Sequence, residues 1–188
     1  MKNLGIVALV ILLSASFTSC EKVKGIFDVD VETTLSGDLE IDIPESATKA
    51  AGYYEFESFA VIDPTVNDDV ADNADRIKEI TADGIIATVT FVSVGDQPTD
   101  DLVLFKGTTF TIKNSTIEAS WTLQDEWPIQ KGSELKLEDV QGIIYGEVST
   151  ILTTLEPFKI ICKGAASLKG ISITITIDID CTVTGNPF

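Results

Sequence analysis

Histidine is absent from the 188 residues, and the chain carries a single arginine, Arg76. Without histidine, Ser-His-Asp and Cys-His catalysis, histidine acid–base chemistry and histidine metal ligation are excluded. With one arginine, no cluster of guanidinium groups can clamp a phosphate or a carboxylate. The sequence also has no phosphate-binding loop, nucleophile elbow or CxxC pair. We therefore expect a protein that is not an enzyme.

Positive charge is scarce, because 13 lysine and arginine residues stand against 30 aspartates and glutamates. The resulting formal net charge of −17 repels nucleic acid and anionic lipid head groups, and it favours solubility. Nucleic-acid binding is therefore excluded as a function.

The first twenty residues have the layout of an export signal. Lys2 gives a positive start, Leu4 to Leu13 form an uncharged apolar run, and small and polar residues lead to Cys20. The run is too short for a transmembrane helix, which needs about 20 apolar residues. A cysteine stands where a secretory signal would have its cleavage site. The segment Phe17-Thr18-Ser19-Cys20 resembles the lipobox of Gram-negative lipoproteins, with Phe17 in place of the usual leucine.

The resemblance implies that residues 1–19 are a signal peptide that is removed and that Cys20 is lipidated. Three acyl chains would hold the protein stably to a membrane. Residues 20–25 would then be a tether and 26–188 a single domain, with a net charge of −18 after the loss of Lys2. In enteric lipoproteins an aspartate after the cysteine favours the inner membrane, so Glu21 favours an outer-membrane location. The periplasmic and the surface-exposed face both stay open.

Alternation of apolar and polar residues dominates the rest of the chain and predicts half-buried strands. In residues 27–43 the alternation continues through Gly37, and we expect two strands with a break near Ser36–Gly37 rather than one long kinked strand. Helical spacing predicts a helix over 138–155, and Asp72 or Asn73 is expected to cap a short helix through Ile80. Further strands are expected over 53–62, 85–94, 102–112, 117–123, 158–166 and 171–183. These elements predict a mainly β fold, an antiparallel β-sandwich of immunoglobulin-like or similar type with one packed helix and a short second helix.

Two acidic segments and one aromatic residue are candidates for ligand contacts. Oxygen-rich loops attract calcium, and the acidic candidates are Asp63, Asp68, Asp69, Asp72, Asp96, Asp100 and Asp101. No EF-hand spacing is present, so helix capping and solvated loops are the favoured interpretation. Trp127, in a loop, is a candidate for stacking on a sugar, although a tryptophan packed over a sheet edge is the commoner arrangement.

Cys162 and Cys181 are both expected on apolar faces. If Lys169-Gly170 closed a regular hairpin, Cys162 would face Ile177 and lie about 13 Å from Cys181. A disulfide requires Cα atoms within about 7 Å, so we expect two buried thiols unless the strands join different sheets. Acidic residues also line the outward positions of the first and last strands. If these strands are neighbours, either the acids are not directly opposite or cations reduce their repulsion.

From the sequence we expect a non-enzymatic binding or structural module held at the cell envelope by the lipid on Cys20. Its partner would be a glycan, a protein or an envelope complex met by loops at one end of the sandwich. The alternatives are a carrier of an apolar ligand, suggested by the helix among long strands, and a carboxylate-based glycan enzyme. The sequence resembles the many small β-sandwich lipoproteins of unassigned function, so no functional residues are transferred.

Overall fold

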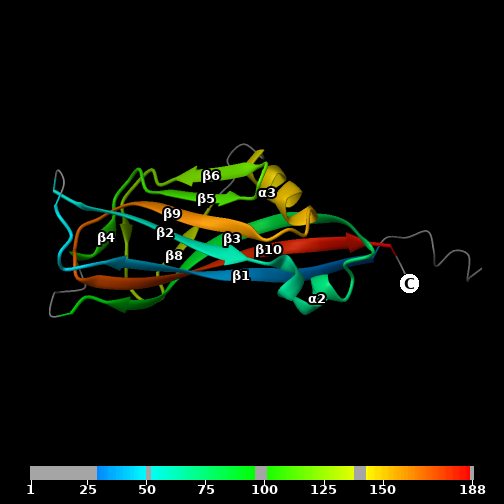
Figure 1. Ribbon diagram of the computed structural model, residues 1–188, viewed down its shortest axis with the longest axis horizontal. Helices are drawn as coiled ribbons and strands as arrows, with labels where there is room; N and C mark the ends of the chain where they lie inside the picture. The colour runs from blue at the N-terminus through cyan, green and yellow to red at the C-terminus, as the bar shows by residue number, and fades with distance from the viewer. Residues whose placement is uncertain (1–28, 50–51, 96–100, 138–142, 187–188) are drawn as a thin grey trace, which may run out of the picture.

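The computed structural model describes residues 29–49, 52–95, 101–137 and 143–186. Over these residues all strand pairings are antiparallel, and two sheets pack face to face around a shared hydrophobic core (Figure 1). The predicted antiparallel β-sandwich is therefore confirmed. The elements are β1 (Val29–Ile43), β2 (Tyr54–Ile62), η1 (Pro64–Val66), α2 (Asp68–Ala71), β3 (Ile77–Ser93), β4 (Val103–Leu104), β5 (Thr109–Lys113), β6 (Glu118–Thr122), β7 (Trp127–Pro128), β8 (Glu134–Lys136), α3 (Ile143–Thr153), β9 (Phe158–Ala166) and β10 (Ile171–Gly185).

The first sheet has the order β1-β10-β3-β8. Its strand β10 is paired on both sides, and every second residue from Ile171 to Val183 is buried. The intervening serine, threonine and aspartate residues face outward. The alternation predicted for the last strand is confirmed, and its β-branched isoleucines suit a central strand.

Strand β1 is continuous, so the predicted break near Ser36–Gly37 is wrong and the single long strand is correct. All 15 residues of β1 pair with β10 in one register, from Val29 opposite Gly185 to Ile43 opposite Ile171. The alternation passes through Gly37 because no loop interrupts the strand there. A glycine inside a strand often marks a close approach of another segment, and this is its role here.

The outward side chains of β1 and β10 form a series of pairs that we call the acid–hydroxyl ladder. The register places the acids of each strand opposite threonine or serine of the other, never opposite another acid. In five pairs the hydroxyl donates a hydrogen bond of 2.5 to 2.8 Å to the carboxylate: Asp30–Thr184, Thr34–Asp180, Ser36–Asp178, Asp38–Thr176 and Asp42–Ser172. The expectation that neighbouring acidic strands avoid direct opposition is therefore confirmed.

The second sheet is built around β9, which lies between β2 and β5. Strand β6 pairs with β5, while β4 and β7 extend the sheet near the end of β9. Because β9 and β10 belong to different sheets, the regular hairpin that would place Cys162 opposite Ile177 does not form, and the alternative of strands in different sheets is correct. Both strands have strongly apolar faces, and the sandwich buries these faces against a common core instead of placing the strands edge to edge.

Helix α3 covers part of the edge of β3 that β8 leaves unpaired. The hydroxyl oxygens of Thr153 and Ser149 accept hydrogen bonds from the backbone N–H groups of Ile80 and Ala82, at 2.9 and 2.8 Å. On its inner side the helix buries Val148, Ile151 and Leu152. The serines and threonines of α3 lower its helix propensity. Two of them, however, accept the backbone hydrogen bonds that a neighbouring strand would otherwise accept at this edge. The predicted helix is confirmed over 143–153, whereas 138–142 lie outside the described residues.

The short second helix exists, but the prediction that it runs from Asp72 or Asn73 to Ile80 is wrong. Helix α2 spans Asp68–Ala71 and is capped by Asn67, whose side chain accepts from two backbone N–H groups. Residues 77–80 belong instead to β3, which pairs with β10 along most of its length. Within the described residues, neither helix combines the length and hydropathy that crossing a membrane requires.

Strands β1 and β2 are edge strands of different sheets, and they lie against one another along one side of the sandwich. The Ser58 hydroxyl donates a hydrogen bond to the backbone carbonyl of Glu40. At Gly37 a Cβ atom would lie 2.6 Å from Cδ1 of the buried Ile62. Gly37 therefore lets the two edges approach closely enough to close the core.

We expect Gly37→Ala to lower the free energy of unfolding by about 1 to 3 kcal/mol, because the added methyl group overpacks the contact with Ile62. Urea denaturation measures the change. Gly146→Ala is the matched control, since Gly146 lies in α3 and a methyl group added there would meet no atom within 4 Å. This control is expected to raise stability by about 0.5 to 1 kcal/mol. Equal effects of the two substitutions would contradict the close approach.

Candidate functional site

The acidic candidates after β2 have local structural roles. Asp63 caps η1 and accepts hydrogen bonds from the backbone and hydroxyl of Thr65. Asp68 and Asp69 lie in the first turn of α2, where negative charge is favourable, and Asp72 follows its last turn. Across the described part of the chain, no group of three or more cysteine, aspartate or glutamate side chains could hold a metal ion. The arrangement matches helix capping and provides no calcium cage.

Of the remaining acidic candidates, Asp101 alone lies within the described residues. Asp101 is exposed, and its backbone carbonyl accepts a hydrogen bond of 2.7 Å from the Ser167 hydroxyl. Asp96 and Asp100 lie outside the described residues, as does Cys20. The calcium and lipidation hypotheses for these three residues therefore stay predictions.

Trp127 cannot provide an open stacking platform for a sugar. Its side chain is 6% exposed, and its strand β7 pairs with β4 at an edge of the second sheet. The ring packs edge-on against Phe110, with 6.3 Å between ring centroids. The hypothesis that Trp127 contacts a ligand is therefore wrong. The ring lies beside Leu104 and Phe110 and is part of the hydrophobic core.

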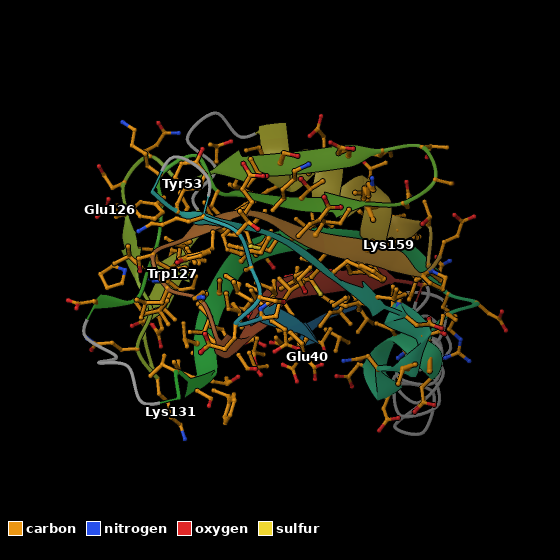
Figure 2. All side chains as sticks on the ribbon, turned by 60° about the vertical axis from the view of Figure 1, so that its left-hand side comes forward. Glu40, Tyr53, Glu126, Trp127, Lys131 and Lys159 are labelled. Carbon is orange, nitrogen blue, oxygen red and sulfur yellow. The ribbon has the colours of Figure 1, made fainter. Side chains whose placement is uncertain are left out.

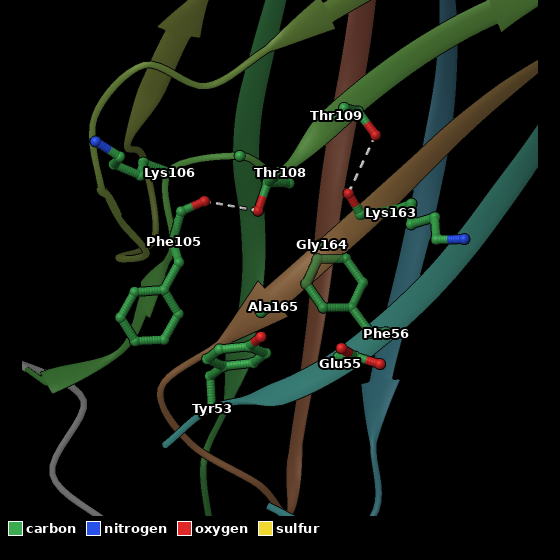
Figure 3. A pocket seen from close by; sticks show the side chains of 11 residues that line it. Tyr53, Glu55, Phe56, Phe105, Lys106, Thr108, Thr109, Lys163, Gly164 and Ala165 are labelled. Atoms are coloured by element: carbon green, nitrogen blue, oxygen red, sulfur yellow. Dashed lines mark hydrogen bonds between the residues drawn. The ribbon is translucent and has the colours of Figure 1, made fainter. Parts of the chain in front are cut away.

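An open cleft of about 500 Å³ lies instead at the outer face of the second sheet (Figure 3). It is located where β2 begins, β9 ends and the chain enters β5. Three segments far apart in the sequence thus meet around it. The lining residues are Tyr53, Glu55, Phe56, Phe105, Lys106, Gly107, Thr108, Thr109, Lys163, Gly164 and Ala165.

Two aromatic rings stand at one side of this cleft. The rings of Tyr53 and Phe105 are tilted by 55° with 6.0 Å between their centroids, and both side chains are partly exposed. Tyr53 shares its parity with the exposed Glu55 and Glu57, so it belongs to the outward series of β2. This parity was readable in the sequence, but the proximity of Phe105 was not.

The turn that carries Phe105 and Lys106 is held by Thr108. The Thr108 side chain is 1% exposed, and its hydroxyl donates a hydrogen bond of 2.8 Å to the carbonyl of Phe105. It occupies the space where a Cβ on residue 164 would lie, so Gly164 is required for this packing. Gly107 completes the turn with a φ of +89°, which favours glycine. The cleft is therefore preorganised by buried contacts.

The charged groups of the cleft are Glu55, Lys106 and Lys163. Lys163 forms an ion pair with Glu57 at 3.4 Å, and the Thr109 hydroxyl donates to the Lys163 carbonyl at 3.3 Å. Together with the two rings, the cleft offers an apolar surface next to hydrogen-bond donors and acceptors. Such a combination suits a ligand that is apolar on one face and hydroxylated at its rim.

Two other hollows of the described residues differ in chemistry. A groove of about 650 Å³ between α3 and β3 is lined mostly by hydroxyl and small side chains, among them Ser149, Thr150 and Thr153. A shallow hollow of about 540 Å³ on the first sheet contains the carboxylates of Glu32, Asp83 and Asp180 beside threonines. The groove also contains Tyr145 beside Lys78 and Glu79, but this single ring has its hydroxyl hydrogen-bonded to the Leu137 carbonyl at 2.9 Å. The cleft at Tyr53 instead places a pair of rings beside charged groups.

Cys162 and Cys181 are free and buried, as expected, and they lie in different sheets. Burial raises the pKa of the Cys162 thiol well above its ordinary range. The pKa of Cys181 is raised to about 11 by burial and then by the nearby carboxylates of Asp83 and Asp180. Neither thiol is therefore poised to act as a nucleophile.

No protein-family model matches the chain, and no curated protein matches it in sequence. Among solved structures, the decameric BFDV capsid protein is similar with a TM-score of 0.46 and 11% identity, over 82% of this chain and 99% of that one. Desmodium yellow mottle tymovirus gives a TM-score of 0.35 and 9% identity, over 87% and 91% of the chains. Turnip yellow mosaic virus gives 0.29 and 11%, over 87% and 84%.

The raised pKa of Cys181 predicts a loss of stability at alkaline pH. The folded state keeps the thiol neutral up to about pH 11, whereas the unfolded chain ionises above about pH 9, so stability present below pH 9 declines as the pH rises towards 11. The destabilisation caused by Cys181→Ala, measured by urea unfolding, should therefore shrink over this range. For the buried neighbour Val183, the effect of Val183→Ala should not change with pH. A pH-independent effect of Cys181→Ala would contradict the assignment.

Proposed function

We propose that this protein is a lipid-anchored, non-enzymatic binding module of the cell envelope that holds a carbohydrate in the cleft at Tyr53. In this proposal residues 1–19 are removed, Cys20 is acylated and the protein resides at the outer membrane. The observation that carries the binding role is the partly exposed ring pair of Tyr53 and Phe105 beside Glu55, Lys106 and Lys163.

The chemistry of a sugar ring fits this arrangement. A pyranose presents C–H groups on its faces, which pack on aromatic rings, and hydroxyl groups at its rim, which need donors and acceptors. The Glu55 carboxylate can accept from sugar hydroxyls, and the ammonium groups of Lys106 and Lys163 can donate to them. The volume of about 500 Å³ lies within the range of small-molecule sites.

The position of the cleft is compatible with an anchor at the N-terminus. Val29 lies beside Gly185 at one end of the long axis, whereas the cleft lies near the start of β2 at the opposite end (Figure 1). The 15 residues of β1 span about 50 Å between these ends. A body anchored through the proposed tether of residues 20–25 would therefore carry its binding cleft on the end remote from the anchor.

The residues of the cleft support binding rather than hydrolysis. Glycoside hydrolysis requires two carboxyl groups at a set separation on either side of the bond, and among the described residues that line the cleft Glu55 supplies the one carboxylate. The apolar-carrier alternative has less support, since the open groove beside α3 includes the charged Lys78 and Glu79 among its hydroxyl and apolar side chains, and the inner side of the helix is packed in the core.

The binding role is tested by screening the full-length protein, purified from membranes in detergent, on an array of bacterial and plant glycans. Tyr53→Ala should weaken binding of a captured glycan about fivefold to tenfold, as expected for a ring contact of about 1 to 1.4 kcal/mol. Phe91→Ala is the matched control, because Phe91 is an exposed aromatic on the first sheet. Unchanged binding by Tyr53→Ala, or the appearance of cleavage products, would refute the proposal.

The anchor is tested by intact-mass analysis of protein from the membrane fraction. We expect a mass that reflects loss of residues 1–19 and addition of acyl chains. Cys20→Ser should keep residues 1–19 and lack the acyl chains, whereas Cys181→Ala should be processed like the wild type. An unmodified thiol on Cys20 in the native material would overturn this part of the proposal.

A further inference from the structure

The outer face of the second sheet continues from the cleft along β2 and carries an unexplained exposed aromatic ring. Phe59 is 62% exposed, the largest exposed fraction of any aromatic side chain among the exposed large hydrophobic residues. It shares the outward parity of Tyr53, Glu55 and Glu57. Its exposure contributes nothing to the core, so packing gives no reason for an aromatic residue at this position.

The neighbours of Phe59 come from β9 and β5. The register places Ile161 opposite Phe59 and Lys159 opposite Val61, while Thr111 of β5 lies on the other side of Ile161. The Lys159 ammonium lies 5.2 Å from the centroid of the Phe59 ring, a cation–π contact that restricts the ring. Between Phe59 and the cleft stands the ion pair of Glu57 and Lys163.

We propose that the carbohydrate site extends from the cleft along the outer face of β2 and β9 to Phe59, and that its ligand is a linear oligosaccharide. This inference rests on the proposed binding function, and it specifies the length of the ligand and the direction in which the ligand lies along the sheet. The six residue steps from Tyr53 to Phe59 span about 20 Å, which exceeds a single sugar ring and suits a short chain. Figure 2 shows Tyr53 and Lys159 towards opposite ends of this sheet.

The alternation of side chains along the face favours an oligosaccharide over other occupants. Apolar positions at Tyr53 and Phe59 are separated by the charged pair Glu57–Lys163, and Thr109 and Thr111 flank them on β5. A stable protein interface buries a large contiguous apolar centre, whereas the exposed apolar side chains here are Phe59 and the adjacent Val61, bounded by Lys159 and by the Glu57–Lys163 ion pair. A lipid surface with anionic head groups is disfavoured by the net charge of −17. Successive sugar rings present both an apolar face and hydroxyl groups at each step.

The test measures affinity against chain length, with the full-length protein in detergent and calorimetry as the readout. The probes are chito-, cello- and malto-oligosaccharides, each from disaccharide to hexasaccharide. We expect the hexasaccharide of one series to bind at least about tenfold more tightly than its disaccharide. Phe59→Ala should weaken binding of the hexasaccharide about fivefold to tenfold and leave the affinity for the disaccharide unchanged, since Phe59 would contact only the sugar rings farthest from the cleft.

Two variants separate this inference from the proposed function. Tyr53→Ala should weaken the disaccharide and the hexasaccharide alike, and Phe91→Ala should weaken neither. Binding that is lost in Tyr53→Ala but is independent of chain length and of Phe59 would overturn the extended site and keep the cleft. Failure of all three series to bind would overturn the inference together with the proposed function for these carbohydrates. If Phe59→Ala changed the oligomeric state, measured by sedimentation, and left oligosaccharide affinity unchanged, the face would be assigned to self-association and the inference would be overturned as well.

Discussion

The pairing of the first described strand with the last constrains the rest of the molecule. A chain with 30 acidic residues must bring carboxylates onto adjacent strands, and directly opposed carboxylates would destabilise the sheet. The register of β1 and β10 avoids this by placing a hydroxyl opposite each acid, as in Asp38–Thr176 and Ser36–Asp178. Each such hydrogen bond is exposed and contributes modestly, but the alternation allows 15 consecutive pairs.

The two outer faces of the sandwich consequently differ in character. The first sheet presents the acid–hydroxyl ladder, whereas the second presents lysines of β5 and β9 among threonines and the exposed ring of Phe59. The net charge of −17 is thus unevenly distributed over the surface. A neutral, hydroxyl-rich ligand finds donors, acceptors and an aromatic ring together on the second face, whereas the first face offers it mainly carboxylates and hydroxyls that already pair with one another.

Much of the fold could be predicted from the alternation of apolar and polar residues. Burial of one face of a strand imposes a period of two, whichever strand it pairs with. Strands β2, β9 and β10 therefore have the expected positions. Which strands pair is decided by contacts distant in sequence, and this explains the errors at Ser36–Gly37 and at the supposed β9–β10 hairpin. The short helix was misplaced because pairing of β3 with β10 outweighs local capping signals at Asp72.

The candidate site was harder to predict for the same reason. Tyr53, Phe105 and Lys163 belong to three segments that become neighbours when β9 pairs with β2 on one side and with β5 on the other. The sequence drew attention to Trp127 because tryptophan in a loop is conspicuous, yet its two-residue strand is part of the second sheet. Parity alone marks Tyr53 and Phe59 as outward, and exposed aromatic residues in a strand are a signal that sequence reasoning can use.

Helix α3 affects whether neighbouring copies of the protein can associate through the edge of the first sheet. The N–H groups of Ile80 and Ala82 would otherwise be an open template on which a strand from another molecule could add. Because Thr153 and Ser149 already occupy these donors, lateral growth of the sheet is blocked at this edge without a further strand. In the proposed lipid-anchored state, confinement to a two-dimensional surface would multiply encounters between neighbouring edges, and this protection would then have its greatest effect.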